Sequence, residues 1–417
     1  MIHRRFMKHV TDQNWIAAGL GLVVCIALLL QHSSAESQDV DERMAFMESL
    51  FTGAEQHQNF HRLAEIFPSG VMKASSSPYT FPIAETIDLP TSYEFAGKSR
   101  DMRAFLEETD TAALVVIADG AIKYENYWLT GGPDVHWMSF SVGKSFVSAL
   151  IGIALEEGHI KSIEDAITDY VPSLNGSAYE GVRIKDILQM SSGARWNEDY
   201  SDPESDIANY IRTLAGNGSL NEFTASLVRE SEPGTAYLYN STDTQALGML
   251  LIAATGQSMT SYAEEKLWQP LGMEKDGYWN TDDEGVEAAA GGLQITARDY
   301  AKLGQLYLNM GRWQGNQIVP SEWVRASITP DAPHLMPGKL YPDYPMGYGY
   351  QWYPLDGDEG EFLAIGVYNQ FIYVNPAKSV VIIKLSAFRD YGKDLEDSSY
   401  REIESIYSLR AIAQSIN

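Results

Sequence analysis

Residues 137–146 read Trp-Met-Ser-Phe-Ser-Val-Gly-Lys-Ser-Phe, and they contain the one Ser-x-x-Lys sequence of the chain, Ser141 and Lys144. Residues three apart on a helix lie on the same face, so the lysine amine can sit beside the serine hydroxyl. A lysine that is partly removed from water loses its charge more easily and can take the serine proton, which makes a nucleophile without a histidine. Alternatively, Ser141 only caps the helix and Lys144 extends from it to solvent.

The residues around this stretch predict a hairpin and then a buried helix. The β-rich runs Ala112–Ala118 and Ala121–Trp128 flank Asp119-Gly120, a pair typical of a tight primed turn. Residues 141–157 are apolar on nearly every side and stop at Gly158, which predicts a helix inside the core. Ser141 and Lys144 would then lie at the mouth of the core.

Strand-rich segments at both ends of the chain, with helical segments between them, predict the fold class. Besides the hairpin, residues 348–353, 361–366, 370–374 and 379–386 are rich in strand formers, and a capped amphipathic helix follows Ser399. We therefore expect an α/β chain of the α+β kind, with an antiparallel sheet flanked by terminal helices and an inserted all-helical lobe. The sheet lobe comprises about 60–140 and 300–417, and the helical lobe about 141–299.

The first 35 residues predict an export signal. Arg4, Arg5 and Lys8 precede an uncharged, mostly apolar run from Ile16 to Leu30, and Ser33-Ser34-Ala35 offers small residues for cleavage. We expect an exported protein, periplasmic or secreted, whose single mature domain is 36–417. The alternative is an uncleaved membrane anchor, although such a run spans only about 22 Å of a ~30 Å hydrocarbon core.

Composition limits the chemistry and the partners. The only cysteine, Cys25, lies in the signal, so the mature part has no disulfide and no cysteine nucleophile. The formal net charge of −26 repels nucleic acid, which we do not expect as a partner, and the oligomeric state is not predicted. His57 and His61 have a spacing that suits a metal, but no third ligand is evident, so we expect a solvated helix face and no metal site. His136 is expected to be structural.

Two further stretches of sequence, together with the Ser-x-x-Lys, form a pattern that is typical of a known family. They are Glu232-Pro-Gly-Thr-Ala-Tyr-Leu-Tyr-Asn-Ser241 and Gly291-Gly-Leu293. With Ser141-Val-Gly-Lys144, in this order, the chain resembles the serine β-lactamase and penicillin-binding superfamily, and its class C members in particular. The resemblance puts Tyr239 at the place of the family's catalytic tyrosine and Ser241 at that of its hydrogen-bonding partner. Tyr237 competes for the first role, but the spacing after Pro233-Gly234 favours Tyr239.

Within this superfamily the chain most resembles the group that contains 6-aminohexanoate-dimer hydrolase and related esterases. The stretch that carries this resemblance, residues 190–200, reads Met-Ser-Ser-Gly-Ala-Arg-Trp-Asn-Glu-Asp-Tyr. It implies that Tyr200 contacts the substrate amide. One departure concerns the strand where the family carries Lys-Thr-Gly, since the best match here is Ala364-Ile365-Gly366. The family's lysine binds the penicillin carboxylate, and its loss removes a contact worth about 1.5–3 kcal/mol.

The resemblance implies a reaction through an acyl-enzyme without a cofactor. Ser141 attacks a carbonyl, Lys144 holds or takes the proton, and Tyr239 relays a proton to the leaving group and then helps to activate water. Lys144 and Tyr239 can share one proton as a coupled pair. Gly366 is retained, so the backbone N–H of Val367 can pair with that of Ser141 as an oxyanion hole.

These observations predict an exported serine hydrolase that acts on a small amide or ester. One alternative on the same fold is a β-lactamase or D-Ala-D-Ala peptidase, which a fluorescent penicillin would acylate at Ser141. Another is a non-catalytic binding module, which no ester, amide or β-lactam probe would acylate and whose activity would survive Lys144→Ala.

Overall fold

The computed structural model describes residues 40–50, 56–341, 344–391 and 401–416. The expected export signal and Ser399 lie outside these ranges. No helix in the described ranges combines the length and the apolar character that a membrane span requires.

The expected hairpin forms one edge of a six-stranded antiparallel sheet. β4 (Thr111–Ala118) pairs with β5 (Ala121–Tyr127), and Asp119 and Gly120 have φ values of 51° and 75°, as a type I′ turn requires. β4 also pairs with β14 (Val380–Ser386), which joins an early strand to the last one. The strand order is β11-β12-β13-β14-β4-β5, and the remaining strands are β11 (Tyr353–Pro354), β12 (Phe362–Gly366) and β13 (Gln370–Asn375).

The first of the expected late strands is wrong over most of its length. Of residues 348–353, only Tyr353 belongs to a strand, β11. The preceding residues form a tight turn instead, in which the Gly349 N–H donates to the Trp352 carbonyl at 2.9 Å. Other N–H groups of the segment donate to carbonyls outside the sheet: those of Tyr348, Tyr350 and Gln351 donate to Leu335, Ser327 and Leu188.

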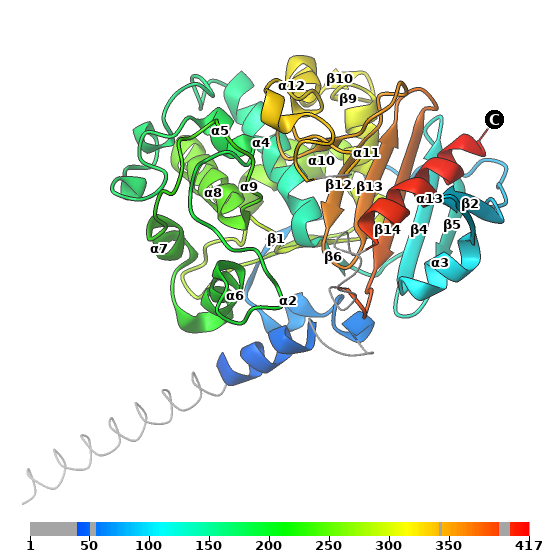
Figure 1. Cartoon of the computed structure of the whole chain (residues 1–417), viewed down its shortest axis with the longest axis horizontal. Helices are drawn as coiled ribbons and strands as arrows, with labels where there is room; N and C mark the ends of the chain where they lie inside the picture. Colours follow the sequence, from blue (N-terminus) through cyan, green and yellow to red (C-terminus); the bar gives the residue numbers. More distant parts are fainter. Residues whose placement is uncertain (1–39, 51–55, 342–343, 392–400, 417) are drawn as a thin grey trace, which may run out of the picture.

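Both faces of the six-stranded sheet are covered, which explains why strands β4, β12, β13 and β14 are buried throughout. Alternate residues of β4 belong to different buried clusters: Val115 to one and Val116 to the other. α11 (Ala297–Leu308) packs so closely on the first face that a Cβ at Gly304 would lie 2.6 Å from Val381. α13 (Glu402–Gln414) covers the second face (Figure 1). The expected fold class is confirmed.

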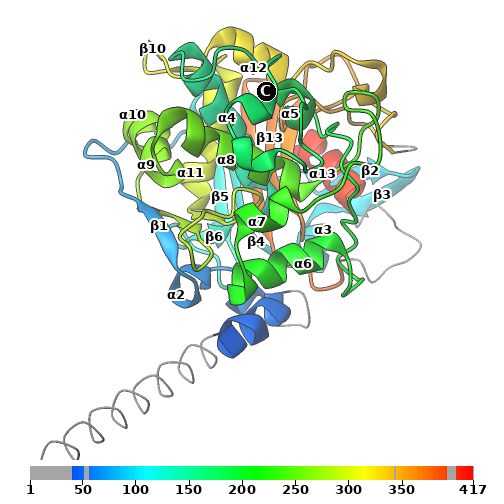
Figure 2. The ribbon, with the colours of Figure 1, turned by 90° about the vertical axis from the view of Figure 1, so that its left-hand side faces the viewer.

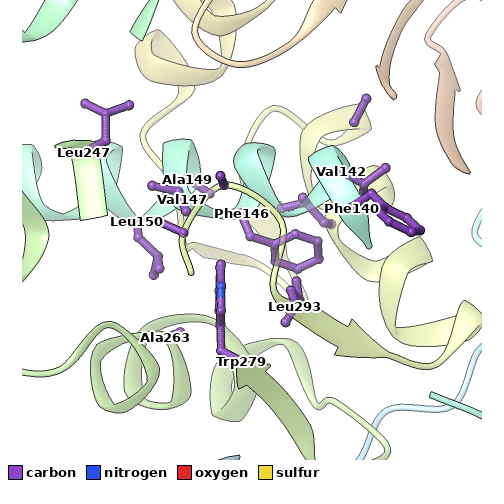
Figure 3. Close-up of a cluster of buried hydrophobic side chains, with 14 of the residues drawn as sticks. Phe140, Val142, Phe146, Val147, Ala149, Leu150, Leu247, Ala263, Trp279 and Leu293 are labelled. Carbon is purple, nitrogen blue, oxygen red and sulfur yellow. The ribbon is translucent and has the colours of Figure 1, made fainter. Parts of the chain in front are cut away.

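The helical lobe lies beside the sheet, between β6 and α11 in the sequence (Figures 1 and 2). Its central helix is buried on nearly every side, as its apolar sequence predicts. Figure 3 shows Phe146 and Leu150 of this helix on the side that faces Trp279 and Leu293. The helices are α4 (Gly143–Glu156), α5 (Ile184–Leu188), α6 (Asp206–Arg212), α7 (Leu220–Ala225), α8 (Ser241–Thr255), α9 (Met259–Ala263) and α10 (Gln269–Leu271).

A second antiparallel sheet joins the two parts of the molecule. Its order is β1-β7-β8-β6, and β7 and β8 fall within the interval 141–299 that was expected to hold only helices. The strands are β1 (Ser69–Met72), β6 (Trp137–Met138), β7 (Gly277–Asn280) and β8 (Leu293–Ile295). Residues 40–50 are also helical. Two short hairpins and three more helices are β2 (Ser92–Phe95), β3 (Lys98–Asp101), β9 (Arg312–Trp313), β10 (Asn316–Gln317), α2 (Leu63–Ile66), α3 (Met102–Glu108) and α12 (Ser321–Ser327).

Candidate active site

Ser141 lies in a single 3-10 turn, η2 (Phe140–Val142), between β6 and α4. The residue before it, Phe140, has a φ of 46°, a left-handed conformation that costs a residue with a Cβ about 1–2 kcal/mol. Its ring packs against those of Phe60 and Tyr368, with centroids 5.1 and 5.4 Å away. Ser141 does not cap α4, since Val142 occupies the N-cap position. The turn instead places the Ser141 hydroxyl within hydrogen-bond distance of Lys144.

Lys144 contacts three oxygen atoms of the site. Its side chain is buried in the first turn of α4, and the residue is only 2 % exposed. The Nζ atom lies 3.0 Å from Ser141 Oγ, 3.2 Å from Ser241 Oγ and 2.6 Å from the Ala290 carbonyl. Burial lowers the pKa of Lys144 from its usual 10.5 to about 8, although the Glu198 carboxylate opposes this shift.

The hydrogen-bond partners of Lys144 fix the direction of the proton on Ser141. Ser241 Oγ donates its proton to Glu198 Oε1 at 2.7 Å, so it can only accept from Lys144. The Ala290 carbonyl also only accepts. A neutral amine has two N–H groups and one lone pair, and both N–H groups are thus used. Once Lys144 is neutral, its lone pair faces Ser141, whose hydroxyl then donates to Nζ. This is the arrangement of a base beside a nucleophile.

Tyr239 lies beside this pair, just before α8. Its ring centroid is 5.3 Å from Lys144 Nζ. Burial raises the pKa of Tyr239 well above 10, and the Glu198 charge adds to this effect, whereas the nearby Ser141 hydroxyl acts to lower the pKa of the phenol. Of the two groups that were expected to share one proton, Lys144 therefore gives it up first and Tyr239 keeps its phenol proton. Tyr239 is placed to act as an acid.

Glu198 is the residue that the sequence analysis missed. Its Oε1 accepts from the hydroxyls of Ser241, at 2.7 Å, and Tyr200, at 3.0 Å. Its Oε2 accepts from the Ser241 N–H at 3.2 Å and from the indole N–H of Trp196. The signal was present, because Glu198 lies two residues before Tyr200 in the stretch that carries the family resemblance. Only the folded loop shows that it contacts Ser241.

The glycine segment and the third strand lie next to the nucleophile, as expected. The Ser139 N–H donates to the Leu293 carbonyl at 2.8 Å, and a Cβ on Gly291 would lie 3.2 Å from Phe140. At the end of β12, a Cβ on Gly366 would lie 2.6 Å from the Ser139 carbonyl. Val367 follows in the turn to β13. Ala364 and Ile365 are buried and supply no cation.

A small cavity of about 50 Å³ opens beside Ser141. Ser241 and Tyr200 contribute to its wall, together with the backbone around Gly291. The cavity is otherwise lined by apolar side chains, and none of the described lining residues is charged. Such a site suits an uncharged group attached to the carbonyl that Ser141 attacks.

The remaining candidates lie elsewhere or have structural partners. Tyr237 packs against Tyr348 with a centroid distance of 5.3 Å, and its buried hydroxyl has no partner in the described part of the chain. His136 is hydrogen-bonded to the Asp276 carbonyl at 2.7 Å. His61 contacts the His57 carbonyl at 3.3 Å. Within the described ranges, no group of three or more potential metal ligands occurs.

The sequence is similar to a known protein family and to one of its relatives. The family model described as Beta-lactamase matches residues 99–404. A 6-aminohexanoate-dimer hydrolase from Paenarthrobacter ureafaciens is 28% identical over 340 residues, which are 79% of this chain and 85% of that protein.

Solved structures share the fold. A Bacillus anthracis protein, described as a candidate 6-aminohexanoate-dimer hydrolase, superposes with a TM-score of 0.78 at 23% identity, covering 88% of this chain and 95% of the other. A class C β-lactamase superposes with a TM-score of 0.56 at 17% identity, covering 76% and 94%.

Proposed function

The chain belongs to the β-lactamase family, and from this premise we propose that it cleaves a small amide or ester through an acyl-enzyme on Ser141. The family membership and the similarity to 6-aminohexanoate-dimer hydrolase that the sequence blocks predict are confirmed. The observation that carries the proposal is the contact of Lys144 with Ser141 at 3.0 Å, in surroundings that lower the pKa of the lysine to about 8. A binding module has no need of a buried amine beside a serine hydroxyl.

The proposed acylation begins with proton transfer from Ser141 Oγ to neutral Lys144 while Oγ bonds to the substrate carbonyl carbon. The backbone N–H groups of Ser141 and Val367 hold the oxygen that becomes negative. Tyr239 donates its phenol proton to the leaving oxygen or nitrogen as the C–O or C–N bond breaks, and Lys144 returns a proton to Tyr239. Water then attacks the ester on Ser141 while the Tyr239–Lys144 pair takes its proton. This proton passes to Ser141 Oγ as the bond between Oγ and the acyl carbon breaks, which releases the acid and restores the serine.

The site supports an amide or ester better than a β-lactam. The apolar residues Ala364 and Ile365 occupy the place of the family's carboxylate-binding lysine. A buried lysine does occur nearby in sequence, Lys384 on β14, but its Nζ lies 5.5 Å from the Phe105 ring, within the cluster beneath α13. Lys384 thus lies on the sheet face away from Ser141 and does not replace the missing cation.

The proposal is tested with a panel of p-nitrophenyl esters, linear amides, D-amino-acid amides and nitrocefin. Each substrate is given to the wild type and to Ser141→Ala. We expect hydrolysis of at least one ester or linear amide, and its loss in Ser141→Ala, which removes only one oxygen. Nitrocefin hydrolysis faster than that of every ester and amide would favour the β-lactamase alternative. Equal turnover by wild type and Ser141→Ala would contradict the proposal.

We also propose that the protein is exported, on the strength of the basic start, apolar run and small residues in 1–35. N-terminal sequencing of the protein from the producing cell is expected to begin at Glu36. A start at the initiator methionine in a membrane fraction would support the anchor instead.

A further inference from the structure

The cavity beside Ser141 has one wall from a distant part of the chain. Met47, in the helical segment 40–50, lines the same cavity as Ser141 and is 2 % exposed. This segment is held to the helical lobe by an ion pair between Arg43 and Asp283, with 2.6 Å between Nη1 and Oδ1. Leu50, the last described residue of the segment, is completely buried. Met47 is therefore a fixed part of the site.

Apart from Ser241 and Tyr200, the other side chains of the wall are also mostly apolar and come from separate elements. α6 contributes Ile207 and Ile211, the turn after it contributes Leu214, and β6 contributes Met138. Tyr210 presents its ring, since its hydroxyl donates to Gln245 Oε1 at 2.8 Å. A group that enters this cavity gains by leaving water but finds no partner for a charge.

The position of Tyr239 decides which half of the substrate enters the cavity. In the proposed function, Tyr239 gives its proton to the leaving group, which must therefore lie beside Tyr239. Among the described residues, Tyr239 does not line the cavity, whereas Ser141 does. The part of the substrate that stays bonded to Ser141 is thus the part that faces the cavity.

We propose that this cavity binds the acyl chain of the substrate, that the chain is linear, aliphatic and uncharged, and that Met47 sets the length of chain accepted. This inference rests on the proposed function. The acyl chain remains in the cavity while the ester oxygen leaves with a proton, so chain length affects acylation of Ser141 directly. Each methylene that leaves water for the cavity is expected to raise kcat/KM about fourfold until the cavity is full.

The test is a series of p-nitrophenyl esters in which only the acyl chain grows, from acetyl to dodecanoyl, measured with the full chain. Met47→Ala is expected to move the optimum toward chains longer by about two carbon atoms, because the side chain it removes leaves space. Met47→Trp is expected to lower kcat/KM at least tenfold for the longer chains and to spare the acetyl ester, by overfilling the same space.

Met44→Ala is the matched control. Met44 lies on the same helical segment and is half-buried, but it is not among the residues that line the cavity. Its chain-length profile is expected to match the wild type. Thermal unfolding of all variants separates loss of folding from loss of selectivity. Intact mass measurements of acylated protein give the same profile if deacylation is slow.

A second series of esters tests the alternative that the cavity binds the leaving group instead of the acyl chain. Acetate esters of alcohols from ethanol to octanol lengthen only the leaving group, and Met47→Ala is expected to leave this profile unchanged. If Met47→Ala alters the alcohol profile and not the acyl profile, the cavity holds the leaving group and the inference is overturned. An unchanged acyl profile in Met47→Ala, with Ser141 still acylated, overturns the inference alone. Absence of acylation by every ester overturns the proposed function as well.

Discussion

At the scale of single residues, the proposed reaction depends on the protonation state of Lys144. Its pKa of about 8 lies below its usual value of 10.5 because the amine is buried. The amine must be neutral to take the Ser141 proton, so kcat/KM is expected to rise with pH through about 8 and then level. Ionisation of Tyr239 is not expected to lower kcat/KM in this pH range, since the pKa of Tyr239 is raised well above 10. The test is to measure kcat/KM as a function of pH with an ester that is chemically stable over this range.

One variant tests whether Lys144 causes this rise of kcat/KM with pH, called the limb below. Lys144→Ala is expected to lose about 10²–10⁴-fold in kcat/KM and to lose the limb with it, because proton transfer by a positioned base contributes this much. A profile that stays flat in the wild type between pH 6 and pH 9, or a limb that persists in Lys144→Ala, would assign the base to another group.

Glu198 is expected to position Ser241 and to adjust Lys144 from a distance. Glu198→Ala leaves the buried Ser241 hydroxyl without its acceptor, which costs about 1–3 kcal/mol and lowers kcat/KM about tenfold. Glu198→Gln keeps an acceptor but removes the charge that raises the pKa of Lys144. The limb of the pH profile is therefore expected to move below 8 in Glu198→Gln. A purely structural role would lower the rate in both variants without moving the limb.

At the scale of elements, the site depends on how closely β12 approaches η2. A Cβ on Gly366 would lie 2.6 Å from the Ser139 carbonyl, which is closer than real Cβ contacts allow. Gly366→Ala is therefore expected to shift the end of β12, displace the Val367 N–H from the proposed oxyanion hole and reduce kcat about 10²-fold.

The control for this variant is Gly360→Ala, in the turn before β12, where a Cβ would meet no atom within 4 Å. Gly360 has a φ of 69°, so its replacement strains the backbone and costs stability without touching η2. Equal kcat in Gly366→Ala and the wild type would show that the Val367 amide takes no part in catalysis.

The elements also show what the sequence could and could not predict. The hairpin at 111–127, the buried helix α4 and strands β12 to β14 follow from long apolar runs and from turn residues with positive φ. β7 and β8 are too short to show an alternating pattern, so they were missed. The sequence blocks that resemble the family predicted that Ser141, Lys144, Tyr239 and Ser241 lie in one site. Glu198 lies in the stretch 190–200 that resembles the family, but only the folded chain shows its contact with Ser241. Met47 lies far from Ser141 in sequence, and no local pattern marks its place in the cavity.

At the scale of the whole molecule, the surface charge works against stability. The chain carries a formal charge of −26, whose self-repulsion is screened by salt. Raising sodium chloride from about 10 mM to about 1 M shortens the Debye length from ~30 Å to ~3 Å. The Tm is therefore expected to rise, since buried ion pairs such as Lys302 with Asp299, at 2.9 Å, are screened little. Potassium chloride should give the same rise, and a lower Tm in both salts would contradict this expectation.

The central claim is that Ser141 forms a covalent adduct, and the most direct test is labelling with a serine-reactive fluorophosphonate followed by peptide mass spectrometry. The wild type is expected to gain one adduct, on the peptide that contains Ser141. Labelling is expected to quicken with pH through about 8, as Lys144 becomes neutral. Ser141→Ala is expected to remain unlabelled. An adduct on another residue, or undiminished labelling of Ser141→Ala, would contradict the account.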